Sequence, residues 1–273
     1  MKRPEDQSAA YRRYRRALRI HRAAVVGSQL LLLAMLLLVW QVAADQHWVN
    51  PMLTSRPTTV WRTFVSMASS GALWTHLAVT LRETLVGFSA GMAGGMLVAV
   101  LLWWYRPLAE VLDPYLVVLN ALPKIALGPI FYIWLGEVNS IYGMAVAISV
   151  IVTVVMLYTG FTGVDPAKLK LMQTFGATRR QILTKVVIPA SLPALMATVK
   201  VNIGLTLVGV IMGEFLSSRA GLGYLIIYGG QVFQMELVMT SVVILAVISA
   251  LLYLTVTWLE RLVTRLLHLP VRE

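Results

Sequence analysis

The sequence KLKLMQTFGATRRQILTKVVIPASLP, residues 168–193, places five cations in the middle of a chain that is otherwise strongly apolar. A helix is expected to enter this stretch, because Asp165 and Pro166 form a typical N-cap and first-turn pair. Gly176 interrupts that helix, and Thr178 begins a second one through the S/T-x-x-Q spacing of a capping box. The stretch therefore predicts a short helix, a glycine corner and another short helix.

Both short helices carry apolar residues at helical spacing. Leu169, Met172 and Phe175 form one stripe on the first helix, and Pro189 and Pro193 are expected to end the second helix before the next apolar run. The apolar positions of the second helix are Ile182, Leu183, Val186 and Val187. A protrusion of this size is too small to hold a catalytic site, and it is suited to insertion into a groove on a partner.

Composition indicates a membrane protein. The 273 residues are 58% hydrophobic and 13% charged, whereas soluble proteins are about half apolar and about a quarter charged. The net charge of +11 could suggest a nucleic-acid partner, but the apolar runs between the basic clusters are too long for that class, so no nucleic acid is expected. The sequence has no cysteine, which excludes disulfides, thiolate metal sites and cysteine nucleophiles.

Six apolar runs reach the length of about 20 residues that a helix needs to cross a bilayer. They are roughly Ala24–Ala44, Leu85–Tyr105, Leu108–Leu135, Ile141–Phe161, Ala194–Leu216 and Leu237–Trp258. Seventeen of the 23 Lys and Arg fall on one side if the N-terminus is cytoplasmic, and only Arg56, Arg62 and Arg219 fall in loops on the other side. We therefore predict an all-α, polytopic membrane protein with six transmembrane helices, the paired short helices in a cytoplasmic loop, and both termini in the cytoplasm.

The same reasoning divides the chain into segments. They are a basic cytoplasmic segment (1–23), the first transmembrane helix (24–44), an extracytoplasmic loop (45–76), a transmembrane domain (77–265) that contains the cytoplasmic loop (163–193), and a cytoplasmic tail (266–273). The first span could be mistaken for a cleaved signal peptide, but its apolar stretch is too long and further spans follow, so we expect it to be retained. Residues 57–70 of the external loop are expected to form a surface amphipathic helix or a linker.

Two spans carry polar residues that could belong to a translocation pathway. The segment NALPKIALGPI, residues 120–130, holds two prolines and a lysine at membrane depth, which predicts a kinked helix beside a cavity. Asn120, Pro123 and Lys124 are the candidate residues there, and Glu214 is the candidate in the fifth span. Alternatives remain open: Lys124 could reach the interface or pair with a carboxylate such as Glu137 or Glu214 to hold helices together, and Glu214 could be a gate or a solvated group.

Glycine spacing in the second span predicts close helix packing. Gly87, Gly91 and Gly95 repeat every four residues, so one face of this helix has no side chains and a neighbouring helix can approach closely. We expect the contact to lie within the protomer or across a dimer.

Motifs for catalysis are not found in the sequence. The histidines are dispersed, no HExxH occurs, and without a Gly-Lys dipeptide the chain has no phosphate-binding loop, so no catalytic residue, no metal site and no ATPase activity are expected. An ion-driven secondary transporter would show repeated halves and carboxylates deep in the membrane, whereas Glu110, Asp113 and Glu214 lie towards the edges of spans. An intramembrane enzyme would need a paired nucleophile and base, which the sequence does not offer.

The stretch quoted at the start, residues 168–193, resembles the cytoplasmic signature loop of ABC-importer permeases. The pattern of that loop is Glu-Ala-Ala, three residues, Gly, nine residues, Ile, one residue and Leu-Pro. Gly176 takes the place of the glycine, Val186 that of the isoleucine, and Ile188 and Pro189 those of the final pair.

The resemblance extends from about Thr80 to Arg265. Within it, the sequence is similar to the nitrate, sulfonate and taurine branch of these permeases. It includes VGVIMGEFLSSRAGLGYLI, residues 208–226. Two departures from the sequence pattern of the family limit which of its properties can be transferred to this chain. Lys170, Leu171 and Met172 replace Glu-Ala-Ala, which reverses a charge, and Lys124 stands where the branch has a proline.

The resemblance implies a transmembrane subunit of a bacterial cytoplasmic (inner) membrane importer. Such a subunit would work as a dimer of two copies with two ATP-hydrolysing subunits below and an extracytoplasmic substrate-binding protein outside. ATP and Mg would bind to the ATPase, this chain would bind no cofactor, and the solute would be of the nitrate, sulfonate, taurine or vitamin-precursor type. The residues expected in the cleft of the ATPase are Gln173, Thr174, Phe175, Gly176, Ala177, Thr178, Arg179 and Arg180.

Overall fold

The structure, a computed structural model, describes residues 9–266, and all the regular secondary structure in this part of the protein is helical. Residues 1–8 of the predicted basic segment and 267–273 of the predicted tail lie outside the described residues. The α-helices are α1 (Ala9–Asp45), α2 (Pro51–Thr54), α3 (Pro57–Ser70), α4 (Ala72–Trp104), α5 (Arg106–Ala121), α6 (Gly128–Thr162), α7 (Pro166–Thr174), α8 (Arg179–Ile182), α9 (Ile188–Ala190), α10 (Leu192–Ser217), α11 (Leu222–Gln231) and α12 (Met235–Leu266). A 3-10 turn, Lys124–Leu127, precedes α6, and a π turn, Leu183–Val187, joins α8 to α9.

Five segments of the described chain are long and apolar enough to cross a membrane, so the protein is a multi-pass membrane protein. They lie in α1, α4, the 3-10 turn with α6, α10 and α12.

The stretch predicted as the third span, Leu108–Leu135, is not one continuous helix. α5 ends at Ala121, and with 16 residues it is about 24 Å long, shorter than the hydrocarbon core of about 30 Å. Leu122 has extended backbone angles, as expected of a residue that precedes proline. The predicted kink at Pro129 is wrong, because this proline lies in the first turn of α6, where its missing N–H costs nothing. A further break lies at Gly136, where φ is 79°.

Contacts divide the chain into two compact units, Met1–Thr63 and Phe64–Glu273, with the boundary inside α3. In the N-terminal unit the end of α1 is held by polar contacts. Asp45 accepts a hydrogen bond from Gln41 at 2.8 Å and pairs with Arg56 at 3.0 Å. The apolar side chains of α1 are exposed, which suits a helix that faces lipid or another protein.

In the second unit, which we call the core unit, α4, α6 and α10 pack closely against one another. A Cβ atom built on Gly87 would lie 2.6 Å from the Cβ of Ala145, and one on Gly91 would lie 2.5 Å from Ser149 Oγ. Such distances leave room only for hydrogen, so the predicted role of the glycine repeat in helix packing within the protomer is confirmed.

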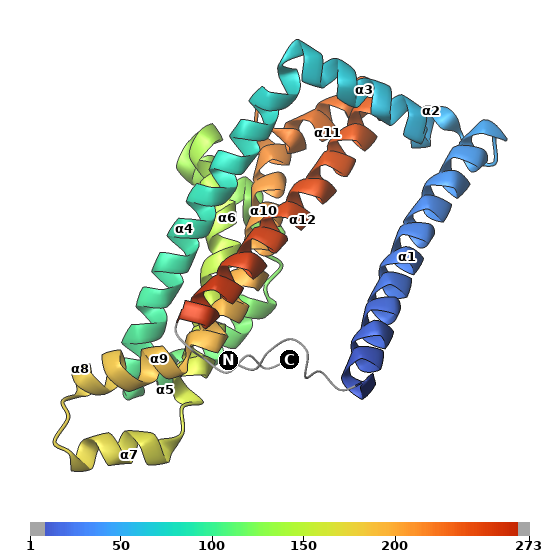
Figure 1. Ribbon diagram of the computed structural model, residues 1–273. Helices are drawn as coiled ribbons and strands as arrows, with labels where there is room; N and C mark the ends of the chain where they lie inside the picture. The colour runs from blue at the N-terminus through green and yellow to red at the C-terminus, as the bar shows by residue number, and fades with distance from the viewer. Residues whose placement is uncertain (1–8, 267–273) are drawn as a thin grey trace. The chain divides into compact units, whose positions relative to one another are not determined.

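Two apolar clusters occupy opposite ends of the core unit. Figure 1 shows α7, α8 and α9 at one end and α11 at the other. The first cluster joins the loop helices to α4 and α6, and its buried members are Ala99, Leu157, Phe161, Val164, Ile182, Leu183 and Val187. The second cluster joins the end of α3 to α4, α11 and α12, and its buried members are Met67, Leu73, Leu222, Leu225, Ile244 and Ile248.

Candidate functional site

The connection between α6 and α10, residues 163–191, contains the predicted pair of short helices, and we call it the α6–α10 loop. Asp165 begins α7, because its carboxylate accepts a hydrogen bond from the backbone N–H of Ala167 at 2.9 Å. Pro166 occupies the first turn, where no backbone donor is needed. The predicted start of this helix is confirmed.

Gly176 forms the corner after α7. The Gly176 N–H donates to the carbonyl of Gln173 at 2.9 Å, and the Ala177 N–H donates to that of Met172 at 3.0 Å. This pair of bonds is the Schellman motif, which satisfies the last carbonyls of a helix and needs a left-handed residue at the turn. Gly176 has φ of +70°, a conformation that costs other residues about 1–2 kcal/mol. The predicted glycine corner is therefore confirmed.

The second helix begins at the predicted capping box. The backbone N–H of Thr178 donates to Gln181 Oε1 at 2.8 Å, and the backbone N–H of Gln181 donates to Thr178 Oγ1 at 3.4 Å. Both halves of the motif are thus present, and two backbone donors that a helix start leaves free are satisfied.

Pro189 does not stop the second helix where the sequence suggested. The helix passes through the π turn, in which the Ile188 N–H bonds to the carbonyl of Leu183, and ends at Ala190. Proline has no N–H, and its ring crowds the carbonyl four residues earlier. The wider π turn moves this carbonyl away and lets the chain remain helical for one more residue after the proline.

Apolar side chains fix one face of the α6–α10 loop to the helix bundle. Ile182, Leu183 and Val187 are at most 6% exposed and belong to the cluster that includes Ala99 of α4 and Leu157 of α6. Burial of each such aliphatic side chain contributes about 1.5–3 kcal/mol. Leu169 and Met172 of α7 pack against the same cluster. The loop is therefore held by packing on α4 as well as on the two helices that it connects.

Arg179 adds a polar link between this loop and α4. Its guanidinium carbon lies 5.7 Å from the ring centroid of Trp103 and 5.8 Å from that of Trp104. Its Nη2 donates to the backbone carbonyl of Trp103 at 3.4 Å. A cation is favourable there, because the last carbonyls of a helix are negatively polarised and lack partners within the helix. The sequence identified Arg179 as a loop cation but gave no signal for its partners on a distant helix.

The opposite face of α7 is exposed and carries both apolar and cationic groups. Phe175 is 77% exposed and Leu171 is 55% exposed. The predicted stripe is therefore wrong at Phe175: this residue is the C-cap of α7, where the chain already turns away from the cluster that Leu169 and Met172 contact. Lys168, Lys170 and Arg180 are also exposed, and within the described residues none of them takes part in an ion pair.

The polar residues predicted at membrane depth lie at the end of α5 and in the turn that follows it. Lys124 donates from Nζ to the backbone carbonyl of Asn120 at 2.9 Å and so satisfies one of the carbonyls that the end of α5 leaves free. Asn120 and Pro123 are exposed. The alternative that Lys124 pairs with Glu137 finds no support, because Glu137 pairs with Arg219 at 2.7 Å.

Glu214 is buried, with 1% of its surface exposed, so the alternative of a solvated group is wrong. Its carboxylate accepts a hydrogen bond from Thr80 Oγ1 of α4 at 2.6 Å and from the backbone N–H of Gly223 at 2.5 Å. Glu83 of α4 is a second buried carboxyl group, and it lies beside Glu214. Glu214 therefore joins α10 to α4 and to the start of α11.

The start of α11 receives two more partners from α4. Thr80 Oγ1 accepts a hydrogen bond from the Leu222 N–H at 2.8 Å, and His76 Nδ1 accepts one from the Gly221 N–H at 3.0 Å. With Glu214, these groups satisfy three successive backbone donors that would otherwise be buried without partners. The sequence placed Glu214 near the edge of a span, but it gave no signal for His76 and Thr80.

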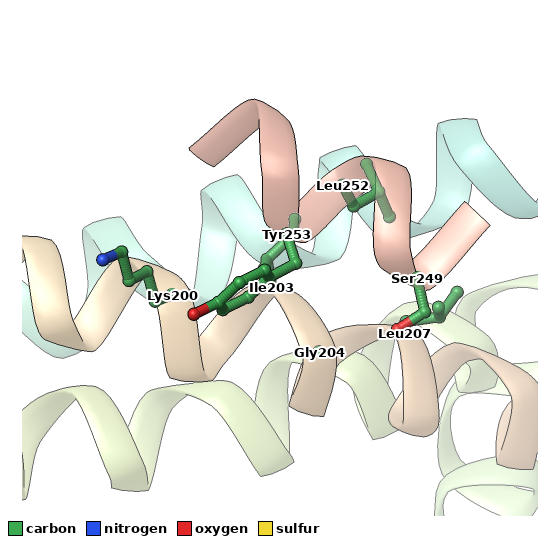
Figure 2. Close-up of a pocket in the computed structure, with 7 residues that line it drawn as sticks. All are labelled: Lys200, Ile203, Gly204, Leu207, Ser249, Leu252 and Tyr253. Atoms are coloured by element: carbon green, nitrogen blue, oxygen red, sulfur yellow. The ribbon is translucent and has the colours of Figure 1, made fainter. Parts of the chain in front are cut away.

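A small cavity lies between α10 and α12 (Figure 2). Figure 2 shows Lys200 and the hydroxyl group of Tyr253 towards one end of it and Ser249 and Leu207 towards the other. The volume is about 60 Å³, which suits a few water molecules and is far below the roughly 300 Å³ of a small-molecule site. Lys200 pairs with Glu260 of α12, so its charge is compensated inside the protein. Across the described residues no group of three or more His, Asp or Glu is placed to bind a metal ion.

Residues 91–268 match a family model described as a binding-protein-dependent transport system inner membrane component. The chain belongs to this family of ABC-importer permeases. The protein is therefore the membrane-spanning subunit of an ABC importer, whose ATP hydrolysis is carried out by a separate subunit. The family also implies an ATPase and a substrate-binding protein as partners of this permease.

Relatives with known descriptions agree with this membership. A protein of Haemophilus influenzae described as an ABC transporter permease is 32% identical over 240 residues, which cover 84% of this permease and 94% of the relative. The SsuC protein of Bacillus subtilis, described as an aliphatic sulfonates transport permease, is 29% identical, and the aligned region covers 85% of this permease and 84% of the relative. The riboflavin transport permease RibX of Chloroflexus aurantiacus is 29% identical over 85% of this permease and 87% of its own length.

Solved structures show the same fold. The MetNI methionine ABC transporter in an inward-facing conformation matches with a TM-score of 0.58 at 19% identity, over 71% of this permease and 95% of the solved chain. An amino acid ABC transporter matches with a TM-score of 0.56 at 21% identity, over 74% of this permease and 97% of that chain.

Proposed function

We propose that this permease forms the pathway for a small polar or anionic solute and that the α6–α10 loop couples it to the ATPase. One observation carries the coupling role. The loop is packed onto α4, α6 and the start of α10 on one face, while the opposite face of α7 exposes Leu171 and Phe175. Such an element can pass a displacement from a cytoplasmic partner to the bundle, because the packed face has little freedom to move alone.

The proposed coupling residues surround the glycine corner. Their backbone is fixed by the Schellman motif and by the capping box. They are Gln173, Thr174, Phe175, Gly176, Ala177, Thr178, Arg179 and Arg180.

For the topology we propose six crossings with both termini in the cytoplasm. The crossings would be α1, α4, α5 with the segment up to Gly136, the rest of α6, α10 and α12. Basic clusters support this orientation, because it places the N-terminal arginines, Arg106 and the α6–α10 loop on one side. The family description names an inner membrane component, which supports the cytoplasmic (inner) membrane of a bacterium as the location.

For the assembly we propose two copies of this permease, two ATPase subunits and one extracytoplasmic substrate-binding protein. ATP and Mg would bind to the ATPase subunits, since this chain lacks a phosphate-binding loop. The exposed apolar residues of α5, among them Val111, Val117 and Val118, offer a surface for the second copy or for lipid.

For the pathway we propose Asn120, Pro123 and Lys124 as lining residues. Non-helical backbone at membrane depth is tolerated where it borders protein or water, and these residues lie at the break between α5 and α6. Glu214 would act on the pathway indirectly, by holding the start of α11. Relatives of this permease are named as transport permeases for aliphatic sulfonates, taurine and riboflavin, so we propose a solute of the nitrate, sulfonate, taurine or vitamin-precursor type.

Reconstitution tests these roles. Vesicles that contain the permease, its co-expressed ATPase and the cognate binding protein should take up solute only with ATP. Gly176→Trp should abolish uptake and leave membrane insertion intact, whereas Gly176→Asn should retain much of the uptake, because asparagine tolerates positive φ. Uptake by the permease alone would refute the importer function, and normal uptake by Gly176→Trp would refute the coupling role of the corner.

A further inference from the structure

The two faces of α7 differ in a way that packing inside the chain does not explain. Leu169 and Met172 point into the apolar cluster below the loop. Leu171 and Phe175 are large apolar side chains that remain 55% and 77% exposed, and Lys170 precedes Leu171 on the same outward side. α7 lies at the extreme end of the core unit, beyond α8 and α9 (Figure 1). An exposed apolar pair at such a place is typical of an interaction surface.

Three cations lie close in sequence to this apolar pair, and among the residues that the structure describes none of them forms an ion pair. Lys168 lies one turn before Leu171, and Lys170 and Arg180 lie on the exposed side of α7 and α8. The neighbouring carboxylate, Asp165, is engaged as the N-cap of α7. The contrast with Arg179 is informative, because its guanidinium is placed over two indole rings and bonded to a carbonyl. Of the loop cations, Arg179 alone has a side-chain partner among the described residues, so Lys168, Lys170 and Arg180 are available to a partner protein.

Docking through Leu171 and Phe175 would bring these cations into the contact. A cation at the edge of a protein interface loses hydration, and the loss is compensated when the partner supplies a carboxylate. A partner with a neutral or basic edge would leave Lys168, Lys170 and Arg180 without compensation. The charge of the loop therefore constrains the surface that can accept it.

We propose that the ATPase of this permease carries an apolar pocket for Leu171 and Phe175 whose rim is lined by Asp and Glu side chains. The rim carboxylates face Lys168, Lys170 and Arg180. This inference rests on the proposed coupling role of the α6–α10 loop and adds the chemistry of the partner surface. The apolar pocket supplies affinity, and the acidic rim selects this permease among others and speeds association.

The test measures binding of the co-expressed ATPase to the purified permease in zwitterionic detergent at low and high salt. Lys170→Glu should weaken binding by at least about tenfold at low salt, because it places like charges opposite each other. The difference from wild type should shrink as salt is raised, since the screening length falls from about 10 Å at 0.1 M to about 3 Å at 1 M. Arg261→Glu, at an exposed position near the end of α12, makes the same change in net charge and should bind as wild type.

Phe175→Ala separates the pocket from the rim. It should weaken binding at every salt concentration, because the apolar contact is not screened. Equal affinities for wild type and Lys170→Glu at low salt would overturn the acidic rim. If Phe175→Ala then still lost binding, the coupling role of the loop would remain intact. A defect of Lys170→Glu that appears only in anionic lipid vesicles would assign the cations to lipid headgroups and would also overturn the proposal. Normal binding by both variants would remove the docking role itself.

Discussion

Arg179 joins the α6–α10 loop to a residue that lies 76 positions earlier in the chain, Trp103 at the end of α4. The loop is covalently continuous with α6 and α10, and this contact adds a polar link to α4, through which the proposed coupling would also act on α4. Exposed cation–π contacts are worth about 0.5–1 kcal/mol each, and loss of the side chain should therefore not unfold the protein.

Arg179→Ala should uncouple ATP hydrolysis from uptake. We expect ATPase binding and hydrolysis to persist and the number of solute molecules moved per ATP to fall several-fold, because α4 no longer follows the loop. Arg179→Lys keeps the cation but loses the planar guanidinium, so its number of solute molecules moved per ATP should lie between those of wild type and Arg179→Ala. Uptake and phosphate release measured on the same vesicles provide the ratio. An unchanged ratio in Arg179→Ala would show that packing alone carries the link.

Glu214 should matter for stability because its partners are buried. Glu214→Ala leaves the Gly223 N–H and the Thr80 hydroxyl without an acceptor, and each such loss costs about 1–3 kcal/mol. We expect a clear fall in the thermal unfolding midpoint in detergent, and a smaller one for Glu214→Gln, which keeps an acceptor oxygen. Thr80→Val combined with Glu214→Ala should cost less than the sum of the two, since they share one hydrogen bond. Additive losses would contradict this arrangement.

At the scale of elements, the glycine face of α4 makes a sharp packing prediction. Gly91→Ala would place its Cβ 2.5 Å from Ser149 Oγ, whereas the nearest atom to a Cβ on Gly94 is Val150 Cγ2 at 3.6 Å. Gly91→Ala should therefore destabilise the bundle by about 1–3 kcal/mol, and Gly94→Ala should be neutral or stabilise it by up to about 1 kcal/mol. Thermal unfolding of the pair in the same detergent measures the difference, and a similar shift in both variants would mean that α4 and α6 are not in close contact here.

The elements also show how far the sequence could be interpreted. Asp165, Gly176 and the Thr178 capping box act within a few residues of themselves, so their positions follow from local hydrogen bonding, and all three predictions are confirmed. The break between α5 and α6 was predicted as a kink in one span, because the sequence shows the prolines but not where the chain regains helical backbone.

Contacts between distant segments were missed for a different reason. The bonds of Glu214 with Thr80 and of Arg179 with Trp103 join residues more than 70 positions apart, and neither partner carries a periodic or local signal. Phe175 was placed with the packed residues because its spacing fits, but the turn at Gly176 redirects it. Spacing along a helix predicts a face only as long as the helix continues.

The proposed topology of the whole molecule predicts which side of the membrane each loop faces. Because the sequence has no cysteine, single introduced cysteines can test this prediction. Single cysteines at Ala17, Pro107 and Thr174 should react with an impermeant thiol reagent only from the cytoplasm, and those at Asn139 and Gln234 only from outside. All five positions are exposed. The expectation follows from the basic clusters, which favour the cytoplasmic side, and from α5 together with the segment up to Gly136 acting as one crossing. Labelling of Pro107 and Asn139 from the same side would mean that α5 does not lead across the membrane, and the fold would then have five crossings with its termini on opposite sides.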